Sequence, residues 1–437
     1  MEQSHVGRLI WLVAALSLAG AVSARAADDP PPPAERLRLV DLVAEAKAHN
    51  PDLSAAAART RAAAAVPARV SALEDPVLSW EGWNFPDSFR VDQADNNIFR
   101  VSQKLPFFGK RALAAEVATR DAEMTATEAR GAELDVVAAV TKAFYELWSG
   151  HRLIAVYTRE KDLVQRVARI AEQKYATSEV SQADVLRAEV ELAHLLNRLE
   201  TAKLAVKGAE ADLREVLSRS ATDPFAIPED PPPTLLPMSV EDATAVALAQ
   251  RPEVAAQHAA IAREEAAVRQ AERARLPDFE VAFSRFVNAH GSDGFGAMAA
   301  VTVPIAQPGK YDAGVEEANA RLASRKAELR RSEDRVRREV ALAFVRAETA
   351  RAQHDLFASA HVPHAEQAFA VTESAYQTGA VDFMSLIDSL RQIEMVHTEH
   401  IEAQVEFERA YADLERAVGK ELPRAAQPPD KGGHHHG

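Results

Sequence analysis

The sequence contains one long segment twice, in an unbroken register. Residues 174–217 align with residues 375–418 at a constant offset of 201 positions, so that Tyr175 matches Tyr376. Chance similarity between two helices does not preserve one register over such a length. The chain therefore consists of two copies of one structural unit, and its fold has to use the same elements twice.

Each copy predicts the same order of elements: a short helix, a second helix after a proline, two strands, a very long helix, a break and a final helix. The short helices cover Leu39–Asn50 and Ser239–Gln250. The first long helix follows Gly109 and extends to about Tyr175 without a proline. At 1.5 Å per residue it would be roughly 100 Å long, which is far longer than an ordinary globular helix.

The final helix of the first copy has apolar or small residues at alternating steps of three and four, which is a heptad seam of coiled-coil type. The seam consists of Val185, Ala188, Leu192, Leu195, Leu199, Ala202, Val206, Ala209, Leu213 and Val216. The second copy repeats the seam with two polar interruptions, Ser389 and His400. Helices with this length and pattern are expected to lie in a tube or rod.

Four segments of about ten residues have the alternating pattern of β-strands. They are Val77–Phe85, Asn97–Leu105, the segment around Phe279–Phe283, and Phe295–Ile305. Each has one mainly apolar face; in the second, Phe99 and Val101 alternate with Arg100. This length and polarity fit a membrane β-barrel, but a half-buried sheet of a soluble protein gives the same pattern, so both interpretations stay open at this point.

Each long helix follows a strand through a proline and a Gly-Lys pair. The junction residues are Pro106, Gly109 and Lys110 in the first copy, and Pro304, Gly309 and Lys310 in the second. We expect the strand to pass into the helix with no intervening loop, because proline ends the ladder and glycine supplies a permissive backbone. The two lysines suit a lipid headgroup boundary.

Composition excludes several classes of protein. The formal charge of −14 argues against a nucleic-acid partner, and the absence of cysteine excludes disulfides and thiolate sites. The N-terminus has the pattern of a secretory signal peptide, with a short membrane anchor as the alternative. We expect a signal peptide at 1–26, a proline-rich segment at 27–37, a first repeat at 38–218, a proline-rich linker at 219–238, a second repeat at 239–420 and a flexible histidine-containing tail at 421–437.

The fold class is therefore mainly α with a small β part. After the signal peptide no apolar run is long enough for a transmembrane helix, so a membrane span would have to use strands. Four strands cannot close a membrane barrel, because such barrels have at least eight, and open sheet edges are not tolerated in lipid. Several copies would then pool their strands, and their helices would form a continuous tube below.

The chain resembles the TolC-like outer-membrane efflux proteins over residues 38–420. The resemblance rests on the duplication, on LPFFGKR and VPIAQPGK at the two junctions, and on YQTGAVDFMSLIDS at the last helix turn. It implies a homotrimer with a 12-stranded barrel in the outer membrane of a Gram-negative bacterium and a 12-helix periplasmic tunnel. It also implies a passive duct, without enzymatic activity or cofactor, that docks on a periplasmic adaptor and an inner-membrane pump of the RND type. The motif LPFFGKR at the first junction is most similar to that of the family branch that exports heavy metals.

The family's periplasmic mouth is ringed by acidic residues near the turn after the long helix. By this resemblance Asp388 occupies one acidic position, whereas Ser385 replaces the acid expected at the other. Asp184 is equivalent to Ser385, and Arg187 is equivalent to Asp388. For both aspartates the alternative is a solvated charge near the start of a helix.

Four further positions complete the tip. Tyr175 and Tyr376 would pack the closed mouth, with plain core packing as the alternative. The tips that contact the adaptor would be Thr177, Ser178, Thr378 and Gly379.

Other chemistry has little support in the sequence. We find no phosphate-binding glycine loop, nucleophile elbow or zinc-protease motif. His434, His435 and His436 in the tail could bind a divalent metal, but a purification remnant or a neutral tail is the favoured explanation. The class that competes with an efflux duct is a soluble periplasmic coiled-coil scaffold whose sheet is not in lipid.

Overall fold

A computed structural model describes residues 36–85, 94–232, 234–236, 238–288, 291–305 and 307–423. The predicted signal peptide, most of the proline-rich segment after it, and the histidines at 434–436 lie outside these ranges. Within them, no helix combines the length and the hydropathy that crossing a membrane requires.

The elements follow the predicted order in both copies, with one difference in the second long helix. The first copy contains α1 (Leu39–His49), α2 (Pro51–Ser71), β1 (Val77–Trp83), β2 (Asn96–Leu105), α3 (Lys110–Ala176) and α4 (Gln182–Leu217). The second contains α5 (Val240–Gln250), α6 (Pro252–Arg273), β3 (Asp278–Asn288), β4 (Gly294–Thr302), α7 (Pro308–Leu356), the π-helical turn η2 (Phe357–His361), α8 (Val362–Gln377) and α9 (Phe383–Val418).

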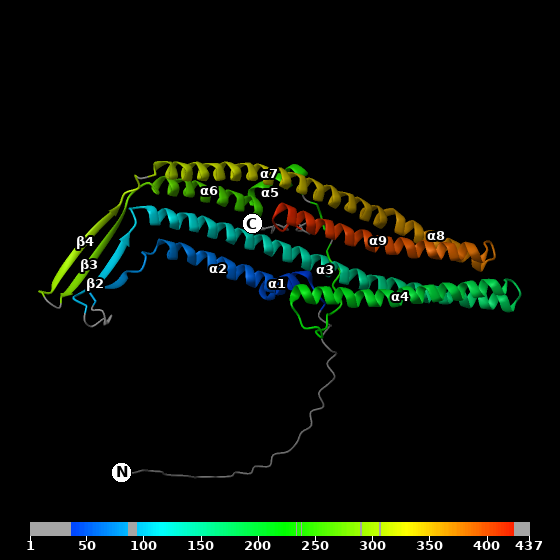
Figure 1. Cartoon of the computed structure of the whole chain (residues 1–437). Coiled ribbons are helices and arrows are strands. Elements are labelled where there is room, and N and C mark those ends of the chain that lie inside the picture. The colour runs from blue at the N-terminus through cyan, green and yellow to red at the C-terminus, as the bar shows by residue number, and fades with distance from the viewer. Residues whose placement is uncertain are drawn as a thin grey trace, which may run out of the picture. The chain divides into compact units, whose positions relative to one another are not determined.

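The four strands form one antiparallel sheet in the order β1-β2-β3-β4. Each copy contributes a hairpin, and the β2–β3 ladder joins the two hairpins with Leu105 opposite Phe279. Among the described strands, β1 and β4 are the outer two, so each has one unpaired edge. The sheet lies at one end of the helices, and the turns α3–α4 and α8–α9 lie at the other (Figure 1).

The register confirms that the sheet has one apolar face. Directly paired residues share a face, and one face carries Leu78, Trp80, Phe99, Val101, Leu105, Phe279, Val281, Phe283, Phe295, Ala297, Ala299 and Val301. Asn97, Gln103 and Arg285 are polar exceptions on that face. The opposite face is mixed: it carries most of the polar side chains, together with some apolar ones. The polar residues are Ser79, Glu81, Arg100, Ser102, Lys104, Glu280, Ser284 and Thr302, and the apolar ones include Ile98, Ala282, Phe286 and Met298. Most of the large apolar side chains on the first face are exposed in the single chain.

The last strand is shorter than predicted. β4 ends at Thr302, whereas we expected the strand to continue to Ile305. Pro304 explains the difference, because it has no N–H to donate to a ladder and starts a turn here. Val303 and Ile305 are exposed but lie beyond the paired segment.

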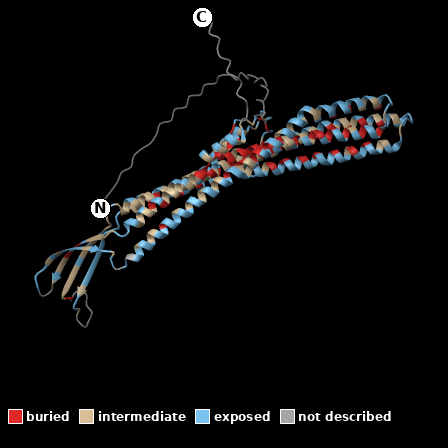
Figure 2. Ribbon diagram, turned by 90° about the horizontal axis from the view of Figure 1, so that it is seen from above, coloured by how far each residue is buried: buried red, intermediate tan, exposed pale blue. Residues whose placement is uncertain are grey.

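The helices bury their apolar stripes in three hydrophobic clusters. One joins α3, α4, α8 and α9 toward the tips, and the other two surround α1 and α5 nearer the middle of the helices. Figure 2 shows the buried residues concentrated in these regions and scarce in the sheet. The predicted seam of α4 is largely buried, including Ala188, Leu195, Leu199, Ala202, Val206, Ala209 and Leu213. In α9 the seam position His400 is only partly buried, and its ring stacks on His354 at 5.3 Å between centroids.

The second long helix is interrupted by the π-helical turn η2, which the sequence analysis did not predict. Before this turn, equivalent buried residues are 200 positions apart, as in Val140 and Val340. After it they are 201 apart, as in Val164 and Ala365. A π turn is an α-helix with one extra residue, and the amide of Val362 donates to the carbonyl of Phe357, five residues earlier. The turn therefore absorbs a single additional residue of the second copy.

The described residues of the proline-rich linker (219–232, 234–236 and 238) form no helix, and the linker is attached to the helices. Its backbone forms a parallel bridge between Pro228 and Leu37, the segment that precedes α1. Trp148 on α3 donates its indole N–H to Asp230 at 3.0 Å. The linker thus fixes the start of the first copy beside the end of that copy.

Candidate functional site

The two helix tips end in the same backbone motif. Ser178 and Gly379, which are equivalent positions, both adopt left-handed conformations with φ of 63° and 77°. The amide of the following residue, Glu179 or Ala380, donates to a carbonyl five residues earlier at 2.8 Å in each tip. This is the Schellman arrangement, which satisfies the last carbonyls of a helix. The predicted adaptor contacts Thr177, Ser178, Thr378 and Gly379 are all exposed.

The helices that follow the tips begin differently. In α4, the side chains of Ser181 and Asp184 form a capping box, and Asp184 also lies 3.0 Å from Arg187. In α9, Asp382 is the cap, and its Oδ1 accepts from the hydroxyl of Ser385 at 2.6 Å and from its amide at 2.9 Å. The Ser385 hydroxyl, and then the amide, lower the pKa of Asp382. Two of the predicted pore residues, Asp184 and Ser385, are therefore engaged in helix capping.

Asp388 has no such role. Its side chain is 68% exposed, and the nearest cationic group, on Arg391, is 4.0 Å away. The carboxylate lies in the second turn of α9, six residues after the cap Asp382. The exposed carboxylate could face the shared axis of an oligomer. Its assignment to the pore stays a prediction.

The two equivalent tyrosines have different environments. Tyr175 is 47% exposed, whereas Tyr376 is 3% exposed. Lys174 from the first tip donates to the carbonyl oxygen of Tyr376 at 3.0 Å and lies 4.8 Å from its ring centroid. Burial, and to a smaller extent the charges of Asp184 and Glu179, raise the pKa of Tyr376. Tyr376 thus joins the two tips within one chain, and Tyr175 is left available for contacts outside it.

Two buried carboxylates also join the tips, and the sequence analysis missed both. Glu191 on α4 accepts from Arg391 on α9 at 2.7 Å, and its side chain is 5% exposed. Glu394 on α9 pairs with Arg198 on α4 in the same way. Each acid lies next to a seam position, where a carboxylate is costly unless it is paired, and this was the available signal.

A third polar cluster lies farther from the tips, between α3, α8 and α9. His397 on α9 is 3.3 Å from Glu160 on α3 and 3.2 Å from Glu366 on α8, with Arg159 at 3.2 Å. These side chains line a cavity of about 280 Å³. The described residues contain no group of three or more His, Cys, Asp or Glu placed to hold a metal ion. The histidines predicted to bind metal, His434, His435 and His436, lie outside the described ranges.

The first junction between sheet and helix is a tight, well-anchored turn. Pro106 follows β2, and Gly109 caps α3 with a φ of 87°, which favours glycine. Lys110 donates to the carbonyl of Leu276 at 2.7 Å and to Asp278 at 2.9 Å. The strand passes into the helix through a short turn, residues 106–109, which contains the expected Pro106 and Gly109 and redirects the chain from the ladder into the helix.

The second junction is built differently. α7 begins at Pro308, so Gly309 lies inside the helix and does not have a positive φ. Proline suits the first helical position because its φ is preset and its missing N–H is not needed there. The expectation that Gly309 supplies a special backbone conformation is therefore wrong. Lys310 lies 5.7 Å from the ring centroid of Tyr311.

Comparison with known proteins identifies the family. A model described as outer membrane efflux protein matches residues 42–219 and, separately, residues 244–420. The chain belongs to this family. The two matches fall on the two copies of the structural unit, each from its first helix to its last.

Individual relatives are distant in sequence and close in fold. The cobalt-zinc-cadmium resistance protein CzcC of Cupriavidus metallidurans is 21% identical over 340 residues, which cover 76% of this chain and 78% of CzcC. A crystal structure of CusC is similar with a TM-score of 0.75 and 17% identity, covering 88% of this chain and 92% of that one. The outer membrane protein VceC of Vibrio cholerae has a TM-score of 0.71 and 16% identity, covering 87% and 96%.

Membership decides between the two classes left open by the sequence. Outer membrane efflux proteins are passive channels of Gram-negative bacteria, with helices that extend into the periplasm, and they act with an adaptor and an inner-membrane pump. The chain is therefore an outer-membrane protein and not an enzyme. The alternative of a soluble periplasmic scaffold is wrong.

Proposed function

We propose that three copies of this chain form one gated duct, which completes a tripartite exporter of heavy-metal cations. The observation that supports this proposal most directly is the four-stranded sheet, which has one mainly apolar face and two unpaired edges. Four strands are too few for a membrane barrel, and joining β1 of one copy to β4 of the next removes every edge. Three copies give a 12-stranded barrel, with the apolar face toward lipid and the polar face toward the lumen.

The helices of the three copies continue the wall as a periplasmic tunnel. The mouth of the tunnel is formed by the α3–α4 and α8–α9 tips, which dock on a periplasmic adaptor through Thr177, Ser178, Thr378 and Gly379. An inner-membrane pump of the RND type supplies the energy. Ion pairs such as Arg391 with Glu191 hold the two tips together in the closed state, and outward movement of one tip opens the mouth.

The proposed cargo, heavy-metal cations, is based on the relative CzcC and on the negative charge expected at the mouth. CzcC is named as a cobalt-zinc-cadmium resistance protein, and it matches along three quarters of this chain. Cations would be attracted by three copies of Asp388 around the mouth. Cells that lack this chain but retain the pump and adaptor should become sensitive to Co²⁺, Zn²⁺ or Cd²⁺, and unchanged tolerance of all three would remove the metal assignment.

The shared barrel is tested by the mass of the protein in mild detergent. The expected result is three copies per particle, and a stable monomer would contradict the proposal. Val301 sharpens the test, because it is 51% exposed in one chain and lies on the apolar face of the edge strand. Val301→Arg should destabilise the barrel by about 2–4 kcal/mol if it faces mid-bilayer. Thr302→Arg, on the polar face, is the matched control and should assemble normally.

A further inference from the structure

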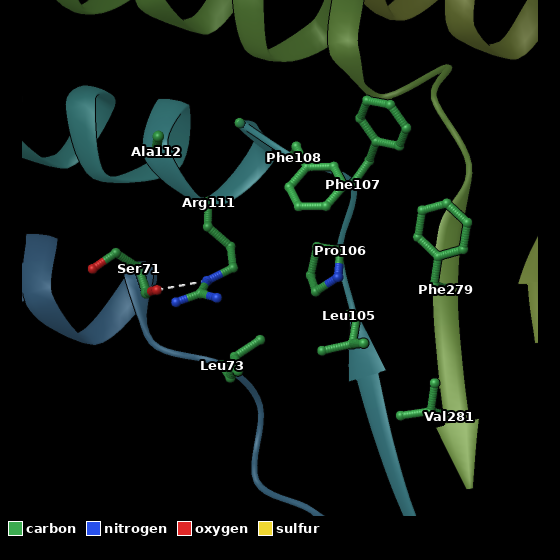
Figure 3. Close-up of a pocket in the computed structure, with 11 residues that line it drawn as sticks. Ser71, Leu73, Leu105, Pro106, Phe107, Phe108, Arg111, Ala112, Phe279 and Val281 are labelled. Atoms are coloured by element: carbon green, nitrogen blue, oxygen red, sulfur yellow. Dashed lines mark hydrogen bonds between the residues drawn. The ribbon is translucent and has the colours of Figure 1, made fainter. Parts of the chain in front are cut away.

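We propose that the groove beside the first junction binds a phospholipid of the inner leaflet of the outer membrane, with its phosphate on Arg111. The groove has a volume of about 770 Å³ and is lined mainly by apolar groups (Figure 3). Its walls are the end of α2, the end of β2 with the turn after it, the first turn of α3 and the start of β3. The side chains proposed to contact the lipid are Leu73, Leu105, Phe108, Arg111, Phe279 and Val281.

The position of the groove favours a lipid over other apolar ligands. Leu105, Phe279 and Val281 belong to the apolar face of the sheet, which faces lipid in the proposed barrel. A second cavity shares Val281 and runs on along the same face past Val101. An acyl chain entering at the junction can therefore continue along the strands. The proposal rests on this orientation of the barrel.

Arg111 supplies the charge at the rim. Figure 3 shows its side chain between the end of α2 and Pro106, with Nε donating to the carbonyl of Ser71 at 2.7 Å. That bond fixes the guanidinium plane, and among the described residues no acceptor pairs with its two terminal amino groups. Two parallel N–H donors of a fixed guanidinium match the oxygens of a phosphate.

Phe108 marks the expected depth of the headgroup. It is 82% exposed, although it stands in a turn that packs Phe107 against Phe279. A phenyl ring has no polar group to place in water, so Phe108 is expected to insert into the acyl region next to the headgroups. Free phosphate would use the arginine without the apolar groove, so the groove itself distinguishes a lipid from an inorganic anion.

The test measures lipid binding to the full-length protein, delipidated in mild detergent and titrated with palmitoyl-oleoyl phosphatidylglycerol in native mass spectrometry. One lipid per chain is expected for the wild type. Arg111→Gln should bind about tenfold more weakly, since losing a charge-assisted hydrogen bond has about that effect. Ala112→Phe, which fills the groove and keeps the charge, should abolish binding. Arg120→Gln changes a partly exposed arginine of the same helix that is paired with Glu123, and this variant should bind as the wild type does.

The outcomes separate this proposal from the channel function. Equal binding by the wild type, Arg111→Gln and Ala112→Phe would overturn the site. Loss in Arg111→Gln with normal binding by Ala112→Phe, or competition by inorganic phosphate, would show anion binding and overturn the lipid. Single-channel conductance is recorded on the same preparations. A wild type that conducts but binds no lipid would contradict only the lipid site. A wild type that binds lipid but does not conduct would contradict only the duct function.

Discussion

The two tips of this chain belong to two copies of one structural unit, but they differ in their capping residues and in their charged side chains. Both end in a Schellman motif at equivalent positions, Ser178 and Gly379. The first tip uses its acid, Asp184, in a capping box, whereas the second caps with Asp382 and leaves Asp388 exposed. Backbone geometry was therefore retained after duplication, and the charges were reassigned.

The difference teaches which tip is built for stability and which for change. Asp184 is bound within its own helix end, so that the first tip has few uncommitted charges. The second copy has an exposed carboxylate at its tip. Farther from the tip, it has a π turn in its long helix and a histidine at a seam position where the first copy has leucine. In the duct proposed above, the second tip would be the one that moves when the mouth opens. Four predictions test the contrast between the two copies.

The largest difference is expected between two single-residue deletions, one in α3 of the first copy and one in the π turn of the second copy. Deleting Thr158 from α3 would rotate the rest of that helix by about 100°, because an α-helix has 3.6 residues per turn. Val164 and Val167, which are fully buried, would leave the core at a cost of several kcal/mol, at about 1.5–3 kcal/mol each. Deleting Ala358 from the π turn should leave a regular helix in register. Thermal unfolding followed by circular dichroism compares the two.

Both deleted side chains are exposed, so neither deletion removes core packing directly. Equal damage by the two deletions would mean that the π turn does not simply absorb one extra residue.

The next effect concerns the mouth. Three Asp388 carboxylates around a narrow axis should bind a trivalent cation, and the attraction between one carboxylate and such an ion at 4 Å is about 3 kcal/mol even in water. Asp388→Ala should therefore weaken block by a periplasmic-side trivalent cation about a hundredfold, allowing for screening by salt. Single-channel recording measures the block. Arg187→Ala, at the equivalent position of the first tip, is the control, and identical block in wild type and Asp388→Ala would remove Asp388 from the pore.

A smaller effect is expected at the two left-handed residues. Gly379→Ala should lower the free energy of unfolding by about 1–2 kcal/mol, because a Cβ is disfavoured in this conformation. Ser178→Gly should stabilise the first tip by up to about the same amount. Chemical denaturation measures both changes. Opposite signs are required, and a stabilising Gly379→Ala would show that the second tip does not keep this backbone in solution.

The smallest effect is expected at the seam position where Leu199 and His400 are equivalent. Burial, followed by the nearby charges of His354, His397 and Arg152, lowers the pKa of His400 from its ordinary 6.5. The unfolded chain then binds more protons, so the contribution to stability is complete above pH 6.5 and is lost as the pH falls below it. His400→Leu should add about 1 kcal/mol and reduce this acid sensitivity.

The measurement is the melting temperature at about pH 7.5 and about pH 5.5, on either side of the ordinary histidine pKa. Leu199→His should introduce the same sensitivity into the first copy. A His400→Leu variant that loses stability with acid as steeply as the wild type would assign the effect to other groups.

Most of the fold could be predicted because it depends on periodic signals. Heptad spacing located the buried stripe of α4, and alternation located the apolar face around Val101. The π turn was missed because one inserted residue changes no composition; its trace was the change of offset from 200 to 201. The pairing of Glu191 with Arg391 was missed because partners on different helices share no local pattern. Gly309 was misjudged because Pro308 had already started the helix.

The sheet's central ladder also determines the order in which the molecule can be made. β1 with β2 and β3 with β4 are local hairpins, but Leu105 meets Phe279 only after α3, α4, α5 and α6 have been synthesised and exported. Pairings between such distant segments form slowly, since the chain entropy of closing a long loop is lost before any contact forms. The first hairpin must therefore wait in the periplasm with an open edge. For a protein of this design, release from export precedes insertion, and the interval between them is when it most needs protection from aggregation.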